Sequence, residues 1–162
     1  MNNSVPDAPS GQVASLHLHP PEPGAPLHST DAIELIAGKG IVGDTRYFGR
    51  PGRPDKPHRR QVTLIGREEI AEHAAALGLQ TIPPGAVRAN IETLGIDLLA
   101  LLGRNVAVGT AIFRFYEPRT PCAKMDAICL GLRDLMKDQR QGVLAEVIQP
   151  GLVRVGDPIR PA

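Results

Sequence analysis

Short apolar runs broken by glycine and proline are the feature that most constrains how this 162-residue chain can fold. The runs are rich in valine, isoleucine and leucine, and they span residues 12–19, 32–38, 61–65, 87–94, 104–109, 111–118, 142–149 and 152–159. Apolar, β-branched runs of this length predict β-strands. Because regular helices do not alternate with them, a repeating strand–helix–strand fold is excluded. We therefore predict a β-rich, mainly antiparallel, barrel-like fold with a few short α-helices.

Other segments have helical or irregular patterns. In 66–78, apolar residues recur at helical spacing, two glutamates lie in the first turn and a glycine ends the pattern, which predicts an α-helix. Shorter helices are predicted at 97–103 and 127–138. The segment 46–60 combines proline, glycine and arginine, so we predict a long surface loop that borders a pocket mouth and is more mobile than the barrel.

The chain has the length of one domain. Residues 1–11 are polar and rich in proline and serine, so we expect a flexible N-terminal tail, followed by a single domain over 12–162. Lys and Arg total 18 against 17 for Asp and Glu, and this balance gives no global field that would gather nucleic acid or an anionic membrane. The apolar runs are too short to span a bilayer, and two cysteines do not make a disulfide framework. We expect a protein of the reducing cytoplasm.

Cys122 is the first candidate for chemistry. It follows an apolar run and Pro121, and Arg119 and Lys124 lie close to it in sequence. Cationic neighbours favour the thiolate, which is the nucleophile and the metal ligand. The alternative is that Cys122 is a small buried core residue, as free cysteines often are. Cys129 lies in an apolar run, so we predict that Cys122 is the reactive thiol and Cys129 an inert core residue.

A cationic and polar group is the second candidate. Arg60 and Gln61 precede one predicted strand, and Arg88 and Asn90 lie two residues apart on another. Alternate strand residues share a face, so Arg88 and Asn90 are predicted to point into the same cavity as Cys122. A guanidinium and an amide on one face suit a phosphate or an amide-bearing ring. The alternative is that Arg88 pairs with Glu92 and that Asn90 caps a bend.

The five histidines do not form a predicted metal site. His17, His19 and His28 are expected on a solvated strand edge, His58 in a loop and His73 on a helix surface. A third and fourth ligand at zinc spacing is missing around them.

Five segments in order give a resemblance to a known family. They are GKGIVGD, RRQVTLI, RANIETLGIDLLALLG, PRTPC and GVLAEVIQPGLVRVGDPI, which together run from Gly38 to Ile159. The series resembles the motifs of the MOSC family, the domain named for the C-terminal part of molybdenum-cofactor sulfurases. The resemblance implies a β-barrel-like fold and a cysteine, at Cys122, that ligates molybdenum or carries sulfur. It also implies that Arg88 and Asn90 approach a pterin cofactor, as in amidoxime-reducing relatives.

The resemblance leaves three functions open. The leading one is an enzyme that binds a molybdenum-pterin cofactor through Cys122, with Arg60, Gln61, Arg88 and Asn90 as further contacts, and reduces N-hydroxylated compounds. The second is a sulfur carrier with Cys122 as a persulfide, and the third is a non-catalytic ligand-binding barrel. The first needs a reductase or electron-transfer protein as partner. The second needs a pyridoxal-phosphate-dependent cysteine desulfurase, and no pyridoxal phosphate is expected in this chain itself.

Overall fold

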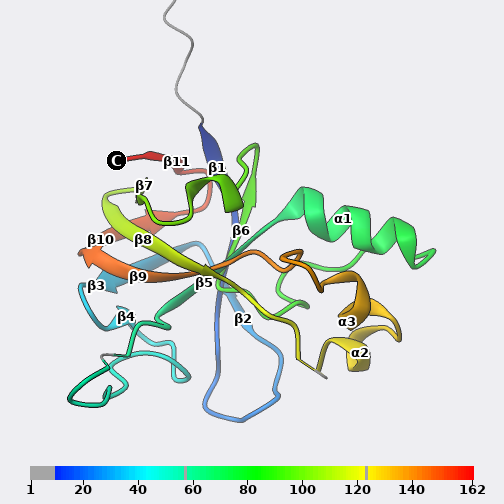
Figure 1. Cartoon of the computed structure of the whole chain (residues 1–162), viewed down its shortest axis with the longest axis horizontal. Helices are drawn as coiled ribbons and strands as arrows, with labels where there is room; N and C mark the ends of the chain where they lie inside the picture. The colour runs from blue at the N-terminus through cyan, green and yellow to red at the C-terminus, as the bar shows by residue number, and fades with distance from the viewer. Residues whose placement is uncertain (1–9, 57, 123) are drawn as a thin grey trace, which may run out of the picture.

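A closed barrel of seven strands forms the centre of the computed structural model, which describes residues 10–56, 58–122 and 124–162 (Figure 1). In order around the ring the strands are β11 (Pro158–Pro161), β7 (Asn105–Val108), β8 (Ala111–Pro118), β9 (Val143–Gln149), β5 (Val62–Gly66), β6 (Ile91–Leu94) and β1 (Gly11–Leu18). The ring closes where β1 pairs with β11. Six of these pairings are antiparallel, and β5 with β6 is parallel. The predicted β-rich, mainly antiparallel barrel is confirmed.

The remaining elements lie around this barrel. A short strand, β2 (His28–Thr30), pairs with β1, and a small sheet has the order β10 (Gly151–Arg154), β3 (Ala32–Ile36), β4 (Gly40–Ile41). The helices are α1 (Arg67–Ala76), α2 (Lys124–Ile128) and α3 (Leu132–Leu135), with a 3₁₀ turn at Leu99–Leu101. All three α-helices lie together on one side of the barrel (Figure 1). Helix α1 follows β5 and leads toward its parallel neighbour β6, because parallel strands need a crossover between them.

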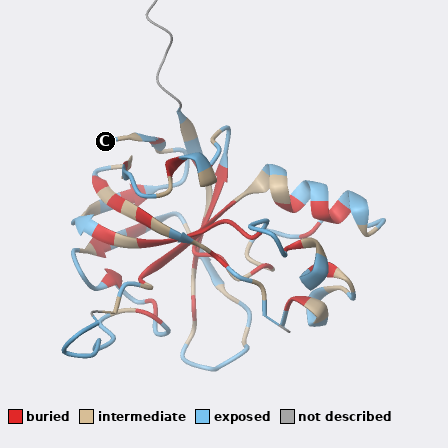
Figure 2. Ribbon diagram, in the orientation of Figure 1, coloured by how far each residue is buried: buried red, intermediate tan, exposed pale blue. Residues whose placement is uncertain are grey.

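Two apolar cores hold these parts together. Strand β8 alternates inward and outward residues, and its inward Ala111, Phe113 and Phe115 are fully buried in the barrel. A second core lies under the helices, where Met125 of α2 and Leu132 of α3 pack with residues of β5 and α1. Figure 2 shows the buried residues concentrated along the barrel strands, whereas the loop between β1 and β2 is mostly exposed. The second core therefore anchors α2, which begins next to Cys122.

Several predicted elements have different bounds in the structure. The strand predicted at 87–94 begins only at Ile91, because the chain turns over residues 84–87 and Arg88 has a left-handed backbone with φ 65°. The strand predicted at 152–159 is split into β10 and β11 by a turn at Gly156, whose φ is 90°. The helix predicted at 127–138 is two helices, separated near Gly131 with φ 97°. In each case a positive φ interrupts the regular element.

The structure describes most of the predicted loop but little of the predicted tail. Residues 1–9 of the predicted tail lie outside the described residues, and Gly11 already belongs to β1. The predicted loop 46–60, of which residue 57 is not described, contains turns and one isolated bridge between Arg53 and Lys56. It is a surface loop as predicted, although its Tyr47 is buried. Within the described ranges, no helix has the length and apolar character to cross a membrane.

Candidate functional site

Cys122 lies at the surface where the barrel meets the helical side of the molecule. Strand β8 ends at Pro118, and α2 begins at Lys124. The Cys122 carbonyl accepts a hydrogen bond of 3.1 Å from the backbone N–H of Met125, which is buried in the second core. The Cys122 residue is exposed, so the alternative of a core cysteine is wrong. Cys129 is half-buried and belongs to neither apolar core, so its predicted place in the core is wrong; its neighbour Leu130 is exposed. Both cysteines are free thiols.

Arg119 lies three residues before Cys122 and is buried, with 6% of its surface exposed. Its Nη2 donates hydrogen bonds to the carbonyls of Val87 (3.0 Å) and Arg88 (3.3 Å). Its Nε and Nη1 atoms are buried and find no hydrogen-bond partner among the residues that the structure describes. Buried donors without partners are rare in native proteins, and a bound anion is one kind of group that would satisfy them.

The electrostatics of Arg119 identify the groups around it. Burial lowers its pKa to about 10; the charges of Tyr47 and Cys122 act against this, and the positive charges of Arg60 and Arg88 add to it. All four side chains are therefore near enough to Arg119 to influence its charge. A buried cation beside two further arginines is costly without a counter-ion. An anion bound at this position would remove that cost.

Two arginine side chains of the loop lie beside the ring of Tyr47. The guanidinium carbon of Arg60 lies 5.2 Å from the Tyr47 ring centroid, and that of Arg46 lies 5.6 Å from it. Arg46 Nε also donates a hydrogen bond of 3.1 Å to the Tyr47 hydroxyl. In the described part of the chain, the arginines that form ion pairs with carboxylates are Arg59, Arg67 and Arg140. The cluster of Arg46, Arg60, Arg88 and Arg119 is thus uncompensated by acidic partners there.

Asp44, which sequence reasoning did not single out, holds this region together. Its Oδ2 accepts hydrogen bonds from the His19 backbone N–H (3.1 Å), the His19 Nδ1 atom (2.8 Å) and Asn90 Nδ2 (2.8 Å). Its Oδ1 accepts from the backbone N–H groups of Arg46 (3.1 Å) and Tyr47 (3.0 Å). Burial alone would raise the pKa of Asp44, but the hydrogen bonds from His19 and Tyr47 outweigh it and keep the pKa below its usual 3.8. Asp44 is therefore a carboxylate, and it positions Tyr47.

Asn90 belongs to the same buried network. Its Oδ1 accepts hydrogen bonds from the backbone N–H (3.1 Å) and hydroxyl (3.2 Å) of Thr63, and its Nδ2 donates to the His17 carbonyl (3.1 Å) as well as to Asp44. These bonds use the whole hydrogen-bonding capacity of the amide. Asn90 therefore joins β1, β5 and the Asp44 turn.

Arg88 does not share a strand face with Asn90, because both precede β6. Its Nη1 donates a hydrogen bond of 2.9 Å to the Ala25 carbonyl. The predicted alternative, a pair between Arg88 and Glu92, is also wrong, since Glu92 pairs with Arg67 at 2.7 Å. Arg88 approaches Arg119 through its backbone carbonyl and its charge.

Gln61 is buried with both ends of its amide engaged. Its Nε2 donates to the His58 carbonyl (3.1 Å) and its Oε1 accepts from the Val147 backbone N–H (2.8 Å). Arg60, its neighbour, leaves Nε buried without a partner in the described ranges. Of this pair, Arg60 has the free donor that an anion would use.

Three histidines lie elsewhere than predicted. His17 and His19 are buried, at 1% and 4% exposure, instead of solvated, because Glu92 and Asp44 reach them from distant segments. His73 is fully buried instead of lying on the helix surface, and its Nε2 is 2.8 Å from the Arg140 carbonyl. No group of three or more His, Cys, Asp or Glu side chains that could hold a metal ion occurs in the described part of the chain.

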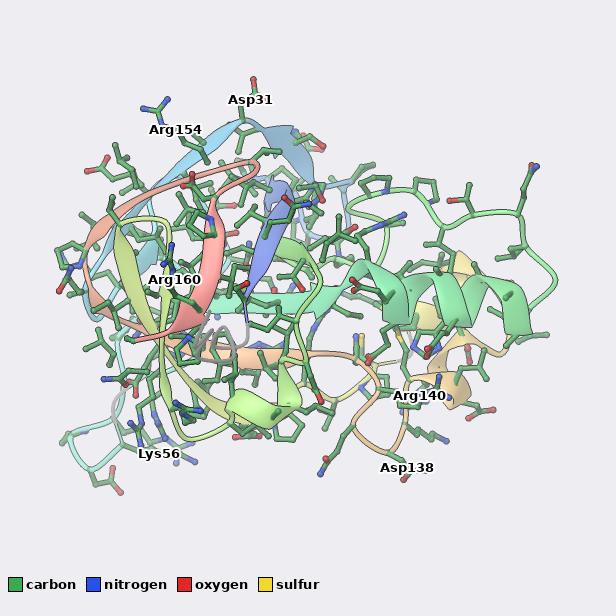
Figure 3. All side chains as sticks on the ribbon, turned by 90° about the horizontal axis from the view of Figure 1, so that it is seen from above. Asp31, Lys56, Asp138, Arg140, Arg154 and Arg160 are labelled. Carbon is green, nitrogen blue, oxygen red and sulfur yellow. The ribbon has the colours of Figure 1, made fainter. Side chains whose placement is uncertain are left out.

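Three surface pockets border this region. One of about 540 Å³ is lined by residues 117–121 with Arg133 and residues 137–139. One of about 470 Å³ is lined by loop residues 51–53, 56 and 58–60 together with Tyr116 and others, and one of about 110 Å³ is lined by His19, Arg46 and Arg88 among others. Lys56 and Asp138, from the two larger pockets, lie on the same side of the molecule, opposite Asp31 and Arg154 (Figure 3). Described residues of the loop 46–60 therefore border two of these pockets, and Cys122 is not among the lining residues of either.

Comparison with known proteins gives a family and a fold. The MOSC domain family model matches residues 27–160. The YuaD protein from Bacillus subtilis superposes with a TM-score of 0.77 at 22% identity, covering 93% of this chain and 94% of that one. YiiM from Escherichia coli gives 0.67 at 21% identity (93% and 69%), and YiiM from Geobacillus stearothermophilus gives 0.71 at 19% identity (94% and 75%). A search of curated proteins found no significant match.

Proposed function

This chain belongs to the MOSC domain family, and on that premise we propose that it binds a molybdenum-pterin cofactor through Cys122 and reduces N-hydroxylated compounds with a redox partner. The observation that carries the proposal is the buried Arg119, three residues before the exposed Cys122, with two guanidinium nitrogens, Nε and Nη1, that lack partners in the described ranges. An anionic cofactor seated beside the thiol would use these donors.

The side chains present fit such a group. A molybdenum-pterin cofactor supplies a redox-active metal that carries its own sulfur ligands, together with an anionic phosphate. A single soft thiolate is a suitable further ligand for that metal. Cys122 is a lone thiol in this role, in keeping with the lack of a three-ligand cluster among the described side chains. In this proposal the chain contributes one ligand to the metal and the positively charged side chains around it.

Each residue of the site has a separate task in this proposal. Cys122 provides the thiolate, Arg60 and Arg119 hold the anionic part of the cofactor by charge-assisted hydrogen bonds, and Arg88 holds Arg119 through its backbone carbonyl. Tyr47 positions Arg46 and Arg60 by contact with its ring. Asn90 and Gln61 act through the backbone segments that they fix, since their amides are already engaged within the protein.

A sulfur carrier is the second candidate, and the exposure of Cys122 favours it. A persulfide on an accessible cysteine can be reached by a partner, and neighbouring cations stabilise its anionic form. In the first function the partner is a reductase or electron-transfer protein, and in the second it is a pyridoxal-phosphate-dependent cysteine desulfurase. Both functions suit a reducing compartment such as the cytoplasm, where thiols stay free.

Molybdenum content tests the first function. Protein made in a host that synthesises the cofactor is purified as wild type, Cys122→Ser and Cys129→Ser, and its metal is measured by elemental analysis. We expect Cys122→Ser to lose molybdenum at least about tenfold, because a ligand is removed, and Cys129→Ser to retain it. In cofactor-free protein, limited alkylation should label Cys122 before Cys129. Equal molybdenum in all three proteins contradicts the proposal; a wild-type protein one sulfur atom heavier and free of molybdenum supports the carrier.

Arg119 gives a second test, which separates binding from stability. Removing one partner of an ordinary buried ion pair costs about 3–5 kcal/mol. Arg119→Met loses two hydrogen bonds to backbone carbonyls, but it also removes a buried charge that has no acidic partner among the described residues. In cofactor-free protein we therefore expect it to lie within about 2 kcal/mol of wild type in urea unfolding. Its molybdenum content should fall nevertheless. A strongly destabilised variant, or one with full molybdenum, would show that Arg119 is structural.

A further inference from the structure

We propose that the small pocket lined by His19, Arg46, Arg50 and Arg88 binds an oxyanion, and that this oxyanion is an acidic group, phosphate or carboxylate, of the substrate. The naming of a substrate rests on the function proposed above, whereas the binding of an oxyanion does not. Four observations carry the inference: the size of the pocket, its charge, the way His19 is held, and its connection to the Cys122 region.

The pocket has the size of a small anion. Its volume is about 110 Å³, and it is lined by the segment 19–24 together with Thr45, Arg46, Arg50 and Arg88. Pockets that enclose a whole cofactor or drug-sized ligand measure about 300–1,000 Å³. The ring system of a pterin therefore does not fit here, while a phosphate or carboxylate group does.

The charge of the pocket is positive. Three arginines line it, and Glu22 is the one carboxylate among the lining residues. None of these arginines forms an ion pair with a carboxylate in the described part of the chain. Arg46 is held by the Tyr47 hydroxyl and Arg88 by the Ala25 carbonyl, each through one N–H group. The guanidinium groups carry further N–H groups that can donate charge-assisted hydrogen bonds to an anion.

His19 is oriented by its neighbours. Asp44 accepts a hydrogen bond from the His19 backbone and lies 2.8 Å from the ring atom Nδ1, and Tyr47 packs edge-on at 5.2 Å between ring centroids. Because Asp44 is a carboxylate, Nδ1 carries a proton and Nε2 is the remaining polar atom of the ring. Nε2 has no protein partner in the described ranges, and the 96%-buried residue lines the pocket. Nε2 therefore offers an acceptor to the O–H of a bound group, such as the hydroxyl of a hydrogen phosphate ion.

The pocket is connected to the Cys122 region through two residues. Arg88 lines the pocket with its side chain, and its carbonyl accepts a hydrogen bond from Arg119. Tyr47 contacts His19 on one side and lies near Arg119, whose pKa it influences. Arg88 and Tyr47 thus join the pocket to the surroundings of Arg119, three residues before Cys122. The inferred substrate class is an N-hydroxylated compound that carries a phosphate or a carboxylate.

Inorganic phosphate is the probe for the pocket, and the test uses cofactor-free protein. Histidine ring resonances are followed by NMR during a phosphate titration of wild type, the double variant Arg46→Ala/Arg50→Ala and the control Arg154→Ala/Arg160→Ala, whose arginines are exposed and lie outside the pocket (Figure 3). We expect the His19 ring to shift while the exposed His28 ring does not. The double variant should bind phosphate at least about tenfold more weakly, since charge-assisted bonds are lost, and the control should match wild type.

Two further samples separate the possible sources of the anion. Arg119→Met should still bind phosphate, because its guanidinium is not part of this pocket. In cofactor-loaded protein, continued phosphate binding at His19 supports a substrate subsite, whereas loss of binding shows that the cofactor occupies the pocket and overturns the substrate assignment. No shift of His19, or equal weakening in the control, overturns the pocket itself. If the proposed function is wrong but the pocket is correctly assigned, wild-type protein will contain no molybdenum and will still bind phosphate.

Discussion

Five hydrogen bonds converge on the buried carboxylate of Asp44, which links segments that are far apart in the sequence. Asn90 reaches it from a position 46 residues away, and His19 from 25 residues away. At the scale of single residues, Asp44 therefore determines where Tyr47 and the arginines of the loop lie.

Replacing Asp44 by asparagine is expected to destabilise the protein. An amide nitrogen would take the place of one oxygen and face N–H donors, leaving buried groups unpaired at a cost of about 3 kcal/mol or more. Urea unfolding measures the loss, and Asp31→Asn, at an exposed turn, serves as the control with little change expected. A near-neutral Asp44→Asn would show that the network rearranges around an amide.

At the scale of elements, the start of β9 decides how closely the strand approaches β5. Gly142 precedes β9 with φ 81°, and a Cβ atom there would collide with the carbonyl oxygen of Leu64. The Gly142 carbonyl also accepts a hydrogen bond of 2.9 Å from the Arg119 backbone. Gly142 thus lets β9 approach β5 closely, and its carbonyl holds the backbone of the segment that leads to Cys122.

Gly142→Ala tests this close approach, and Gly156→Ala is its matched control. Gly156 has a similar φ of 90°, but no atom lies within 4 Å of an added Cβ. The loss of stability in Gly156→Ala therefore reports the backbone strain alone, about 1 kcal/mol. Gly142→Ala adds the steric collision and should cost about 3 kcal/mol or more in urea unfolding. Equal losses in the two variants would mean that β9 shifts without penalty.

At the scale of the whole molecule, buried titratable groups make the stability depend on pH. Burial lowers the pKa of His73 and also that of His17, where Glu92 acts in the opposite sense. Both are favoured as neutral rings in the folded state. Their contribution to the free energy of unfolding is fully present above pH 6.5, the ordinary pKa of histidine. It is lost as the pH falls from 6.5 toward the lower pKa of the folded state. Asp44 has a lowered pKa, so its contribution is lost only at still lower pH.

We therefore expect the free energy of unfolding to decrease between about pH 7.5 and pH 5.5, with a slope approaching about 1.4 kcal/mol per pH unit for each histidine. Glu69 acts in the opposite sense, because burial raises its pKa. Urea unfolding at several pH values measures the slope. In His73→Gln, whose amide can still donate to the Arg140 carbonyl, the slope should be smaller, and an unchanged slope would exclude His73 as a source.

The sequence determined most of the elements and the family-level features of this protein. Apolar runs fixed the strands β5, β8 and β9 within about a residue, because alternation and glycine or proline boundaries are local properties. The helix at 66–78 was predicted for the same reason and is present as α1. The ordered motifs indicated the MOSC family, and the position of Cys122 after β8 followed from the strand pattern.

Only the tertiary structure decided which polar groups are buried and what they contact. The sequence around His17 and His19 predicts an exposed strand edge. In the fold, however, Glu92 and Asp44, from later parts of the chain, lie against the two rings, and both residues are buried. Arg88 and Asn90 were assigned one strand face, but a turn and a left-handed residue separate them before β6 begins. Arg119 was recognised as a neighbour of Cys122, while its burial depends on Val87 and Arg88, about 30 residues away. Burial and long-range hydrogen bonds arise from the path of the whole chain, so no local pattern encodes them.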